Sequence, residues 1–307
     1  MALEKQFESI DQIEKELEKV QYIADRSLAT ALFLASRLEK PIFLEGEPGV
    51  GKTEVGIVLA SLFNTKLIRL QCYEGLDVST ALYEWNYPKQ LLHIRIGELE
   101  KKGKEEIEKA IYGPEFLIRR PLLEAILNSN ERPPVLLIDE IDRSDEEFEA
   151  FLLEILSDFQ ITIPEVGTIK AEKRPAVVVT SNRTRDVHDA LKRRCLYHWI
   201  DYPSFEKECR IVKAKVPGID ENLASQITHF MQKLRTVDFL KKPGISETLD
   251  WAAALIAMQR KYLDEDIVLE TLGCILKYQE DISRFNEEIW SDHDQRKEFL
   301  RIPQQVQ

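Results

Sequence analysis

The sequence has few cysteines, and no cysteine or histidine spacing that is typical of a metal site. Its four cysteines are far from one another and form no CxxC pair, and none of the five histidines lies in an HExxH pattern. This pattern excludes a disulfide framework and argues against a protein-bound transition metal. We expect reduced, buried thiols at Cys72, Cys195, Cys209 and Cys274.

Long apolar runs are absent as well. No run approaches the roughly 20 residues that a helix needs to cross a bilayer. The first residues, MALEKQFESIDQ, carry acidic side chains and lack the apolar segment of a signal peptide. We therefore expect a cytoplasmic protein without stable membrane insertion.

Positively charged residues are fewer than negatively charged ones. The 42 lysines and arginines are outnumbered by 54 aspartates and glutamates, which leaves a net charge of −12. Broad, non-specific binding of nucleic acid needs a basic surface that displaces counterions. The composition therefore argues against a nucleic-acid partner, although it is compatible with a local basic patch. A chain of 307 residues has room for one large domain or two smaller ones.

Near-continuous runs of β-branched residues and leucine predict a parallel sheet. The runs VLLIDE (135–140) and AVVVTSN (176–182) are typical of strands buried on both faces. IFLE and KLIRLQC predict two further strands, LYHWIDY is a weaker candidate for a fifth, and ITIPEVGTI predicts a hairpin. Helical patterns alternate with the strands, so the fold class is α/β with a doubly wound parallel sheet.

Helical patterns also mark the two ends of the chain. Apolar positions recur at helical spacing from about Ile10 to Leu38, and only helical patterns follow Ser204. We expect an α/β core with an N-terminal helix over residues 1–203 and a smaller helical domain over 204–307. Ser144 and Glu147 have the spacing of a capping box, and the charged run 98–109 predicts a solvated helix.

The segment GEPGVGKTEV matches the phosphate-loop pattern GxxxxGK[ST]. Glycines let backbone N–H groups surround a β-phosphate, Lys52 would neutralise the β- and γ-phosphates, and the Thr53 hydroxyl would ligate Mg²⁺. The segment follows a predicted strand and opens a predicted helix, which disfavours an incidental glycine-rich turn. The predicted nucleotide-binding residues are Gly46, Glu47, Pro48, Gly49, Val50, Gly51, Lys52, Thr53 and Glu54.

Two carboxylates end the strand VLLIDE, at the edge where an open α/β sheet binds its ligands. There Asp139 would hold Mg²⁺ through its water shell, and Glu140 would polarise the attacking water. The alternative is that both residues only cap the following turn. Such a pair favours hydrolysis over passive binding.

Three further polar residues are catalytic candidates. Asn182 ends the next strand, where its amide could contact the γ-phosphate or the water; asparagine is also a common turn residue. Arg193 and Arg194 lie in DALKRRC at a predicted helix C-terminus. They either complement the helix dipole or include an arginine finger for a neighbouring subunit, and the sequence does not choose between the two arginines.

This order of parts resembles the AAA+ ATPases from about Ile10 to Tyr278, and within them the MoxR family and its CoxD-type branch. The narrower likeness is carried by four segments: GEPGVGKTEV, QCYEGLDVSTALYEWNYPKQLL, LLIDEIDRSDEEFEAFLLEIL and TSNRTRDVHDALKRRC.

The resemblance implies an ATPase that works as an oligomeric ring, a hexamer in this family, and remodels or matures protein clients. It implies a von Willebrand factor A partner and a carbon monoxide dehydrogenase-like metalloenzyme client. It also implies that residues 75–91 and the ITIPEVGTI hairpin line a central pore. The alternatives are a nucleic-acid motor or loader, and a scaffold that binds ATP but barely hydrolyses it.

One position departs from the family pattern. Many MoxR proteins carry an arginine in the helical domain where this chain has Thr248, within PGISETLDW. The coupling of nucleotide state to that domain is therefore in doubt, and Lys241, Lys242 or Arg260 are candidate substitutes.

Overall fold

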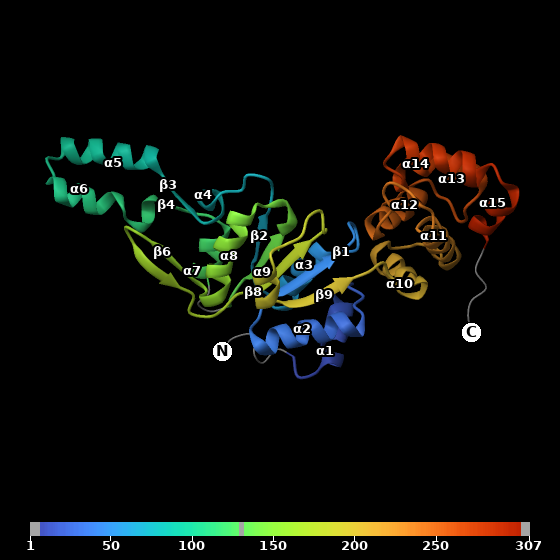
Figure 1. The fold of residues 1–307 in the computed structure, drawn as a ribbon, viewed down its shortest axis with the longest axis horizontal. Coiled ribbons are helices and arrows are strands. Elements are labelled where there is room, and N and C mark those ends of the chain that lie inside the picture. The colour runs from blue at the N-terminus through green and yellow to red at the C-terminus, as the bar shows by residue number, and fades with distance from the viewer. Residues whose placement is uncertain (1–6, 129–131, 302–307) are drawn as a thin grey trace. The chain divides into compact units, whose positions relative to one another are not determined.

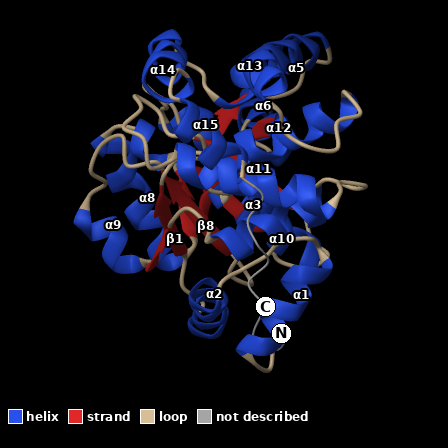
Figure 2. Ribbon diagram, turned by 90° about the vertical axis from the view of Figure 1, so that its right-hand side faces the viewer, coloured by secondary structure: helices blue, strands red, loops and turns tan. Residues whose placement is uncertain are grey.

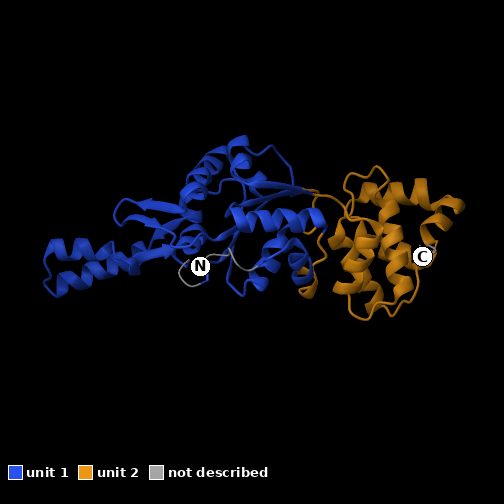
Figure 3. Cartoon of the chain, turned by 90° about the horizontal axis from the view of Figure 1, so that it is seen from below, with its two compact units in different colours: residues 1–16, 25–45, 52–199 blue, residues 17–24, 46–51, 200–307 orange. Residues whose placement is uncertain are grey.

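The computed structural model describes residues 7–128 and 132–301. The chain forms two compact units, drawn in different colours in Figure 3. The first contains residues 1–16, 25–45 and 52–199, and the second contains residues 17–24, 46–51 and 200–307. The division expected at Pro203 stays a prediction.

A five-stranded sheet forms the centre of the α/β part, in the order β2-β5-β8-β1-β9. Its strands are β1 (Ile42–Gly46), β2 (Leu67–Gln71), β5 (Val135–Asp139), β8 (Ala176–Ser181) and β9 (Leu196–Ile200). The pairs β1–β8, β5–β8 and β2–β5 are parallel, and β1 lies beside β8 in Figure 2. All residues of β1 and β5 are buried. The predicted α/β class with a parallel sheet is confirmed.

Helices precede and follow these strands: α1 (Ile10–Lys19), α2 (Arg26–Leu38), α3 (Lys52–Leu62), α7 (Pro121–Leu127), α8 (Glu146–Asp158) and α9 (Asp189–Arg194). The prediction of one helical segment from Ile10 to Leu38 is wrong in one respect. The chain leaves α1 after Lys19 and passes through Gln21 at φ 60°. This left-handed residue separates α1 from α2.

The N-terminus of α8 is capped by a different residue from the one predicted. The carboxylate of Asp145 accepts a hydrogen bond from the Phe148 N–H at 2.8 Å. The Ser144 hydroxyl instead donates to the Ile141 carbonyl at 2.8 Å. The predicted capping box of Ser144 and Glu147 is therefore wrong, because the neighbouring aspartate is the N-cap.

A long insert separates β2 from α7. It contains α4 (Val78–Ala81), β3 (Tyr83–Trp85), α5 (Tyr87–Leu99), α6 (Lys104–Ile111) and β4 (Leu117–Arg119), with β3 and β4 antiparallel. α5 and α6 pack side by side (Figure 1). The charged run 98–109, predicted to be one helix, includes the turn between them. Five apolar side chains of α5 are 44–83% exposed, and we call them the exposed α5 apolar residues: Tyr87, Leu91, Leu92, Ile96 and Leu99.

The predicted hairpin ITIPEVGTI is confirmed as β6 (Gln160–Ile163) paired antiparallel with β7 (Gly167–Lys170). The second unit contains α10 (Phe205–Lys215), α11 (Glu221–Leu234), α12 (Ile245–Ala257), α13 (Glu265–Ile275), α14 (Gln279–Arg284), a π-helical segment (Phe285–Trp290) and α15 (His293–Leu300). Aromatic rings fill its core, with the Phe230 centroid 5.0 Å from those of Trp251 and Phe299. Among the described helices, none combines the length and apolar character that a membrane crossing needs.

The expectation for the cysteines is half right. Cys72 and Cys195 are buried, and burial raises the pKa of each thiol to about 12. Cys209 and Cys274 are only partly buried. All four are free thiols.

Candidate nucleotide-binding site

The glycine-rich segment joins β1 directly to α3. Gly49 and Gly51 have φ of 76° and 91°, which favour glycine over other residues. A Cβ at Gly49 would also lie 2.7 Å from the Ser246 hydroxyl oxygen. Within this segment Glu47 and Pro48 are exposed and Val50 is buried. The local conformation is one in which successive N–H groups can surround a phosphate.

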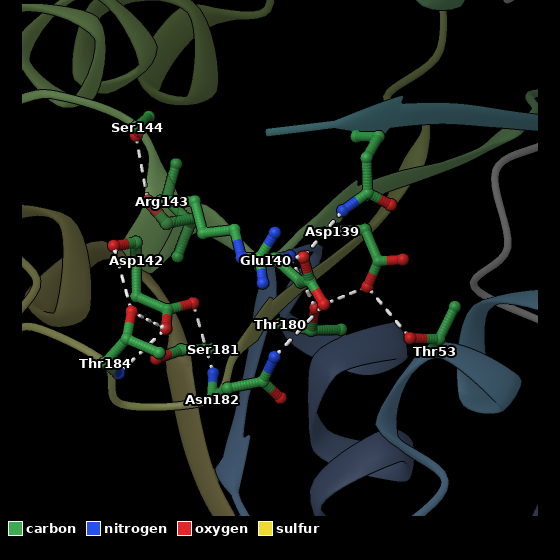
Figure 4. Close-up of polar contacts among 12 residues, drawn as sticks. Thr53, Asp139, Glu140, Asp142, Arg143, Ser144, Thr180, Ser181, Asn182 and Thr184 are labelled. Atoms are coloured by element: carbon green, nitrogen blue, oxygen red, sulfur yellow. Dashed lines mark hydrogen bonds and ion pairs between the residues drawn. The ribbon is translucent and has the colours of Figure 1, made fainter. Parts of the chain in front are cut away.

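Lys52 and Thr53 form the first turn of α3. Lys52 is buried, with 5% of its surface exposed, while Thr53 and Glu54 are partly buried. The Thr53 hydroxyl donates to Asp139 Oδ1 at 2.9 Å (Figure 4). The structure therefore brings together the two residues that the sequence predicts as metal ligands.

The Asp139 carboxylate is almost fully buried and accepts hydrogen bonds at both oxygens. Oδ1 also accepts from the Thr180 hydroxyl at 2.6 Å. Oδ2 accepts from Arg69, from Nε at 3.0 Å and from Nη2 at 2.5 Å. The Asp139 side chain is 1% exposed, against 51% for Arg69. Hydrogen bonding and an adjacent cation compensate the burial of this charge.

Glu140 has a left-handed backbone at φ 56°, and its N–H donates to the Thr180 hydroxyl at 2.9 Å. Its carboxylate accepts from the Asn182 amide at 3.2 Å and from the Gln71 amide at 2.9 Å. Arg143 Nε lies 3.1 Å from Glu140 Oε2. Glu140 and Asn182, predicted from separate strands, are therefore in contact, and both catalytic candidates are oriented by neighbours.

Sequence reasoning missed Asp142, which positions the loop after β8. This buried carboxylate accepts from the backbone N–H of Asn182 at 3.1 Å and from that of Thr184 at 2.9 Å. The Thr184 hydroxyl adds a bond at 2.7 Å. Figure 4 shows Asp142 between Asn182 and Thr184. A third acidic residue in IDEID was the only available signal, because its partners lie about 40 positions away.

Arg193 and Arg194 are the last residues of α9, and both are exposed. Arg194 Nη1 donates to the Leu153 carbonyl of α8 at 3.2 Å. Among the described residues, Arg193 has no side-chain hydrogen bond or ion pair. The two arginines, which the sequence does not separate, therefore differ in their surroundings.

Thr248, the position that departs from the family pattern, belongs to a buried hydrogen-bond network in the helical unit. The Thr248 hydroxyl donates to Glu208 at 2.7 Å and accepts from Arg235 at 3.1 Å. Arg235 also donates to the carbonyl of Pro243 at 2.8 Å, next to the start of α12. The candidate substitutes Lys241, Lys242 and Arg260 are all exposed. Sequence reasoning did not single out Arg235.

Within the second unit, the start of α12 contacts the glycine-rich segment. The N–H of Ile245 donates to the Gly49 carbonyl at 2.8 Å. The Glu247 carboxylate closes the N-terminus of α12 by accepting from the Gly244 N–H at 2.8 Å. Arg235, through its bond to the Pro243 carbonyl, therefore supports a loop that touches Gly49.

The donor set at Asp139 and Thr53 fits Mg²⁺. The cation prefers hard oxygen ligands and usually binds one or two protein oxygens, taking its remaining ligands from phosphates and water. A hydroxyl and a carboxylate 2.9 Å apart can supply those two oxygens.

A parallel sheet whose first strand leads through a glycine-rich turn into a helix is the architecture of phosphate-loop nucleotide-binding proteins. The sequence matches the family model described as AAA domain (dynein-related subfamily) over residues 41–195, about half of the chain. The chain belongs to this family. It is therefore an ATP-hydrolysing enzyme of the AAA+ class, as its resemblance to AAA+ proteins implies.

Several relatives match most of the chain. The uncharacterized protein SH1500 of Staphylococcus haemolyticus is 29% identical over 78% of this chain and 84% of its own. The uncharacterized protein SERP0979 of Staphylococcus epidermidis is 28% identical over 74% and 79%. A solved structure of the Thermotoga maritima RuvB Holliday junction branch migration motor is 19% identical, with a TM-score of 0.45 over 88% of this chain and 72% of its own. An identity and a TM-score this low support no conclusion about function from the similarity to RuvB.

Proposed function

We propose that this ATPase binds ATP with Mg²⁺, acts as an oligomeric ring of the MoxR type, and uses hydrolysis to remodel or mature protein clients. The observation that carries the hydrolytic part is the contact of Asn182 with Glu140, beside the Thr53–Asp139 pair. A carboxylate held by amide groups next to a candidate metal site is suited to polarising water.

Each residue has a distinct role in this proposal. The backbone of residues 46–51 holds the β-phosphate, and Lys52 neutralises charge on the β- and γ-phosphates. Thr53 and Asp139 hold Mg²⁺, which when bound neutralises charge that develops on the phosphates. Glu140 orients and polarises the attacking water, and Asn182 fixes the Glu140 carboxylate.

The surroundings of the two arginines of α9 favour an oligomeric ring. An arginine finger supplied by a neighbouring subunit must be exposed and unengaged in its own subunit. Among the described residues, Arg193 satisfies both conditions, whereas Arg194 donates to Leu153. We therefore assign the finger to Arg193. Ring size, with a hexamer as the family expectation, follows from the resemblance.

A protein client is favoured over nucleic acid by the surface of the chain. The net charge of −12 opposes a polyanion. The exposed α5 apolar residues lie on the insert after β2, and a concentration of large exposed apolar side chains is typical of protein contacts. The narrower assignment, to metal-centre assembly in a carbon monoxide dehydrogenase-like enzyme with a von Willebrand factor A partner in the cytoplasm, rests on the MoxR and CoxD resemblance.

The test uses a Glu140→Gln variant that binds ATP without turning it over. It is purified from the native host in ATP and in ADP, beside a Glu147→Gln control on the exposed first turn of α8. Proteins retained only by Glu140→Gln in ATP are then added to the wild-type enzyme. The proposal expects them to raise ATP turnover. It fails if only DNA or RNA raises turnover, or if no added protein does.

A further inference from the structure

The edge strand β2 directs a cationic side chain along the sheet toward the end of β5. Burial alternates along β2, with the residues on either side of Arg69 buried and Arg69 exposed. In the parallel pair, Arg69 lies opposite Leu137 and Gln71 lies opposite Asp139. Asp139 is two residues beyond the partner of Arg69 on β5. The long Arg69 side chain therefore extends along the sheet, in the direction of the strands, to reach the Asp139 carboxylate.

That guanidinium saturates one oxygen of the predicted metal ligand. Two nitrogens of Arg69 donate to Asp139 Oδ2, and Nη2 also donates to Gln71 Oε1 at 2.5 Å. The other oxygen of Asp139 accepts from the hydroxyls of Thr53 and Thr180. Both side-chain oxygens of Asp139 thus accept hydrogen bonds, and the Arg69 guanidinium is a cation in direct contact with the carboxylate.

We infer that Arg69 is the resident counter-cation of Asp139 and competes with the divalent metal for this carboxylate. A buried carboxylate without a partner is costly, so a cation is needed whenever the metal is absent. Arg69 supplies it from a side chain that is half exposed and can move into water at little cost. The inference deepens the proposed Mg²⁺-dependent ATPase and makes Arg69 a positioning residue.

The metal site should therefore bind a divalent cation weakly in the nucleotide-free enzyme. A divalent cation alone has to displace a charge-assisted contact in which two guanidinium nitrogens donate to one carboxylate oxygen. A cation that arrives with nucleotide also gains the phosphate oxygens as ligands. Arg69 therefore restricts tight metal binding to the nucleotide-bound state.

Mn²⁺ binding to the nucleotide-free enzyme tests this inference without any turnover. Free Mn²⁺ is measured by electron paramagnetic resonance with wild type, Arg69→Gln and Lys66→Gln. Lys66 is a matched control because it precedes β2, is 61% exposed and pairs with Glu124 away from Asp139. We expect Arg69→Gln to bind Mn²⁺ about tenfold more tightly, in line with the loss of one partly exposed ionic contact. Lys66→Gln should match wild type.

A double variant and thermal unfolding test whether the tighter Mn²⁺ binding occurs at Asp139. Arg69→Gln combined with Asp139→Asn should lose the tighter Mn²⁺ binding, and Mn²⁺ should raise the melting temperature of Arg69→Gln more than that of wild type. Equal Mn²⁺ affinity of wild type and Arg69→Gln overturns the inference, as does a gain that persists with Asp139→Asn. If Arg69→Gln does not fold, Arg69→Lys keeps the charge without the fork and should show a smaller gain in the same direction.

Nucleotide binding separates this inference from the proposed function. Fluorescent ADP should bind wild type and Arg69→Gln equally in excess EDTA, and the Mg²⁺ concentration for half-maximal tight binding should fall in Arg69→Gln. Weaker ADP binding by Arg69→Gln in EDTA would mean that the guanidinium contacts the nucleotide, which overturns the inference. If wild type binds no nucleotide under any condition, the ATPase function fails, while the Mn²⁺ comparison still decides the role of Arg69.

Discussion

The guanidinium of Arg235 and the carboxylate of Glu208 form a buried bidentate pair in the helical unit, with both nitrogen–oxygen distances 2.6 Å. The two side chains are 6% and 0% exposed. Arg235 also lies over the ring of Tyr202, 4.9 Å from its centroid, and donates to the Pro243 carbonyl. One arginine thus joins α10 to the loop that precedes α12.

Removing one partner of this pair should be strongly destabilising. In Arg235→Met the Glu208 charge stays buried without its cation, at a cost of about 3 kcal/mol or more. The control is Lys233→Met, which breaks an exposed pair with Glu298 and should cost about 1 kcal/mol at most. Urea unfolding followed by tryptophan fluorescence checks this, since Trp251 lies in the same unit. Equal midpoints for the two variants would contradict the prediction.

Features set by neighbouring residues could be predicted from the sequence, and features set by residues far apart in the chain could not. The strands β1, β5 and β8 were predictable because a parallel sheet buried on both faces produces apolar runs within a few residues. The glycine-rich segment was predictable because its conformational requirement is local. Arg235 was not, because its partners Glu208 and Thr248 are 27 and 13 positions away and meet only when the helices pack.

The errors at element ends have a different, local origin. Ser144 and Asp145 are both good N-cap residues. The Ser144 hydroxyl donates to the Ile141 carbonyl within the preceding turn, so Asp145 caps the helix. Gln21 carries no signal for a left-handed conformation, so the break between α1 and α2 was invisible. The sequence carries no signal that singles out Arg69, and strand pairing was needed to place it at Asp139.

Lys52→Ala should abolish productive nucleotide binding. The ammonium is buried at the start of α3, where a lost phosphate contact is not replaced by water. We expect affinity for ATP to fall by roughly 100-fold or more, measured by calorimetry, with Lys66→Ala as the exposed control. Unchanged affinity and full turnover would remove the assignment of the phosphate loop.

Glu140→Gln should separate binding from hydrolysis. The amide keeps the shape of the side chain but loses the charge that polarises water, so ATP affinity should stay near the wild-type value. Turnover should fall by about 100-fold or more, the range typical of a lost general base. Phosphate release beside a Glu147→Gln control measures this. Turnover at the wild-type rate would place the catalytic base elsewhere.

Nucleic acid should neither bind stably nor raise turnover near physiological salt. The net charge of −12 repels a polyanion. Fluorescence anisotropy with labelled single- and double-stranded DNA and with RNA, together with ATPase assays, checks this across salt concentrations. Tight binding with a steep salt dependence would instead favour the nucleic-acid motor.

The last prediction concerns Arg193, the arginine of α9 whose side chain has no hydrogen bond or ion pair among the described residues, and it tests the ring. A finger supplied by a neighbouring subunit can be worth ~10³-fold or more in rate, because it meets charge that develops on the transferred phosphoryl group. Arg193→Ala should therefore fold and bind ATP but hydrolyse it at least ~10³-fold more slowly. Arg194→Ala loses its bond to the Leu153 carbonyl and should show a much smaller fall in rate.

Mixing variants shows whether Arg193 acts between subunits. Arg193→Ala keeps its phosphate site, and Lys52→Ala keeps its arginine, so a mixed ring contains interfaces where both are intact. Some activity should return when the two inactive variants are combined, and it should depend on protein concentration. Subunit exchange is verified by energy transfer between labelled subunits. If exchange occurs and no activity returns, Arg193 acts within its own subunit or only as a helix-end cation, and the strongest structural support for an obligate ring is lost.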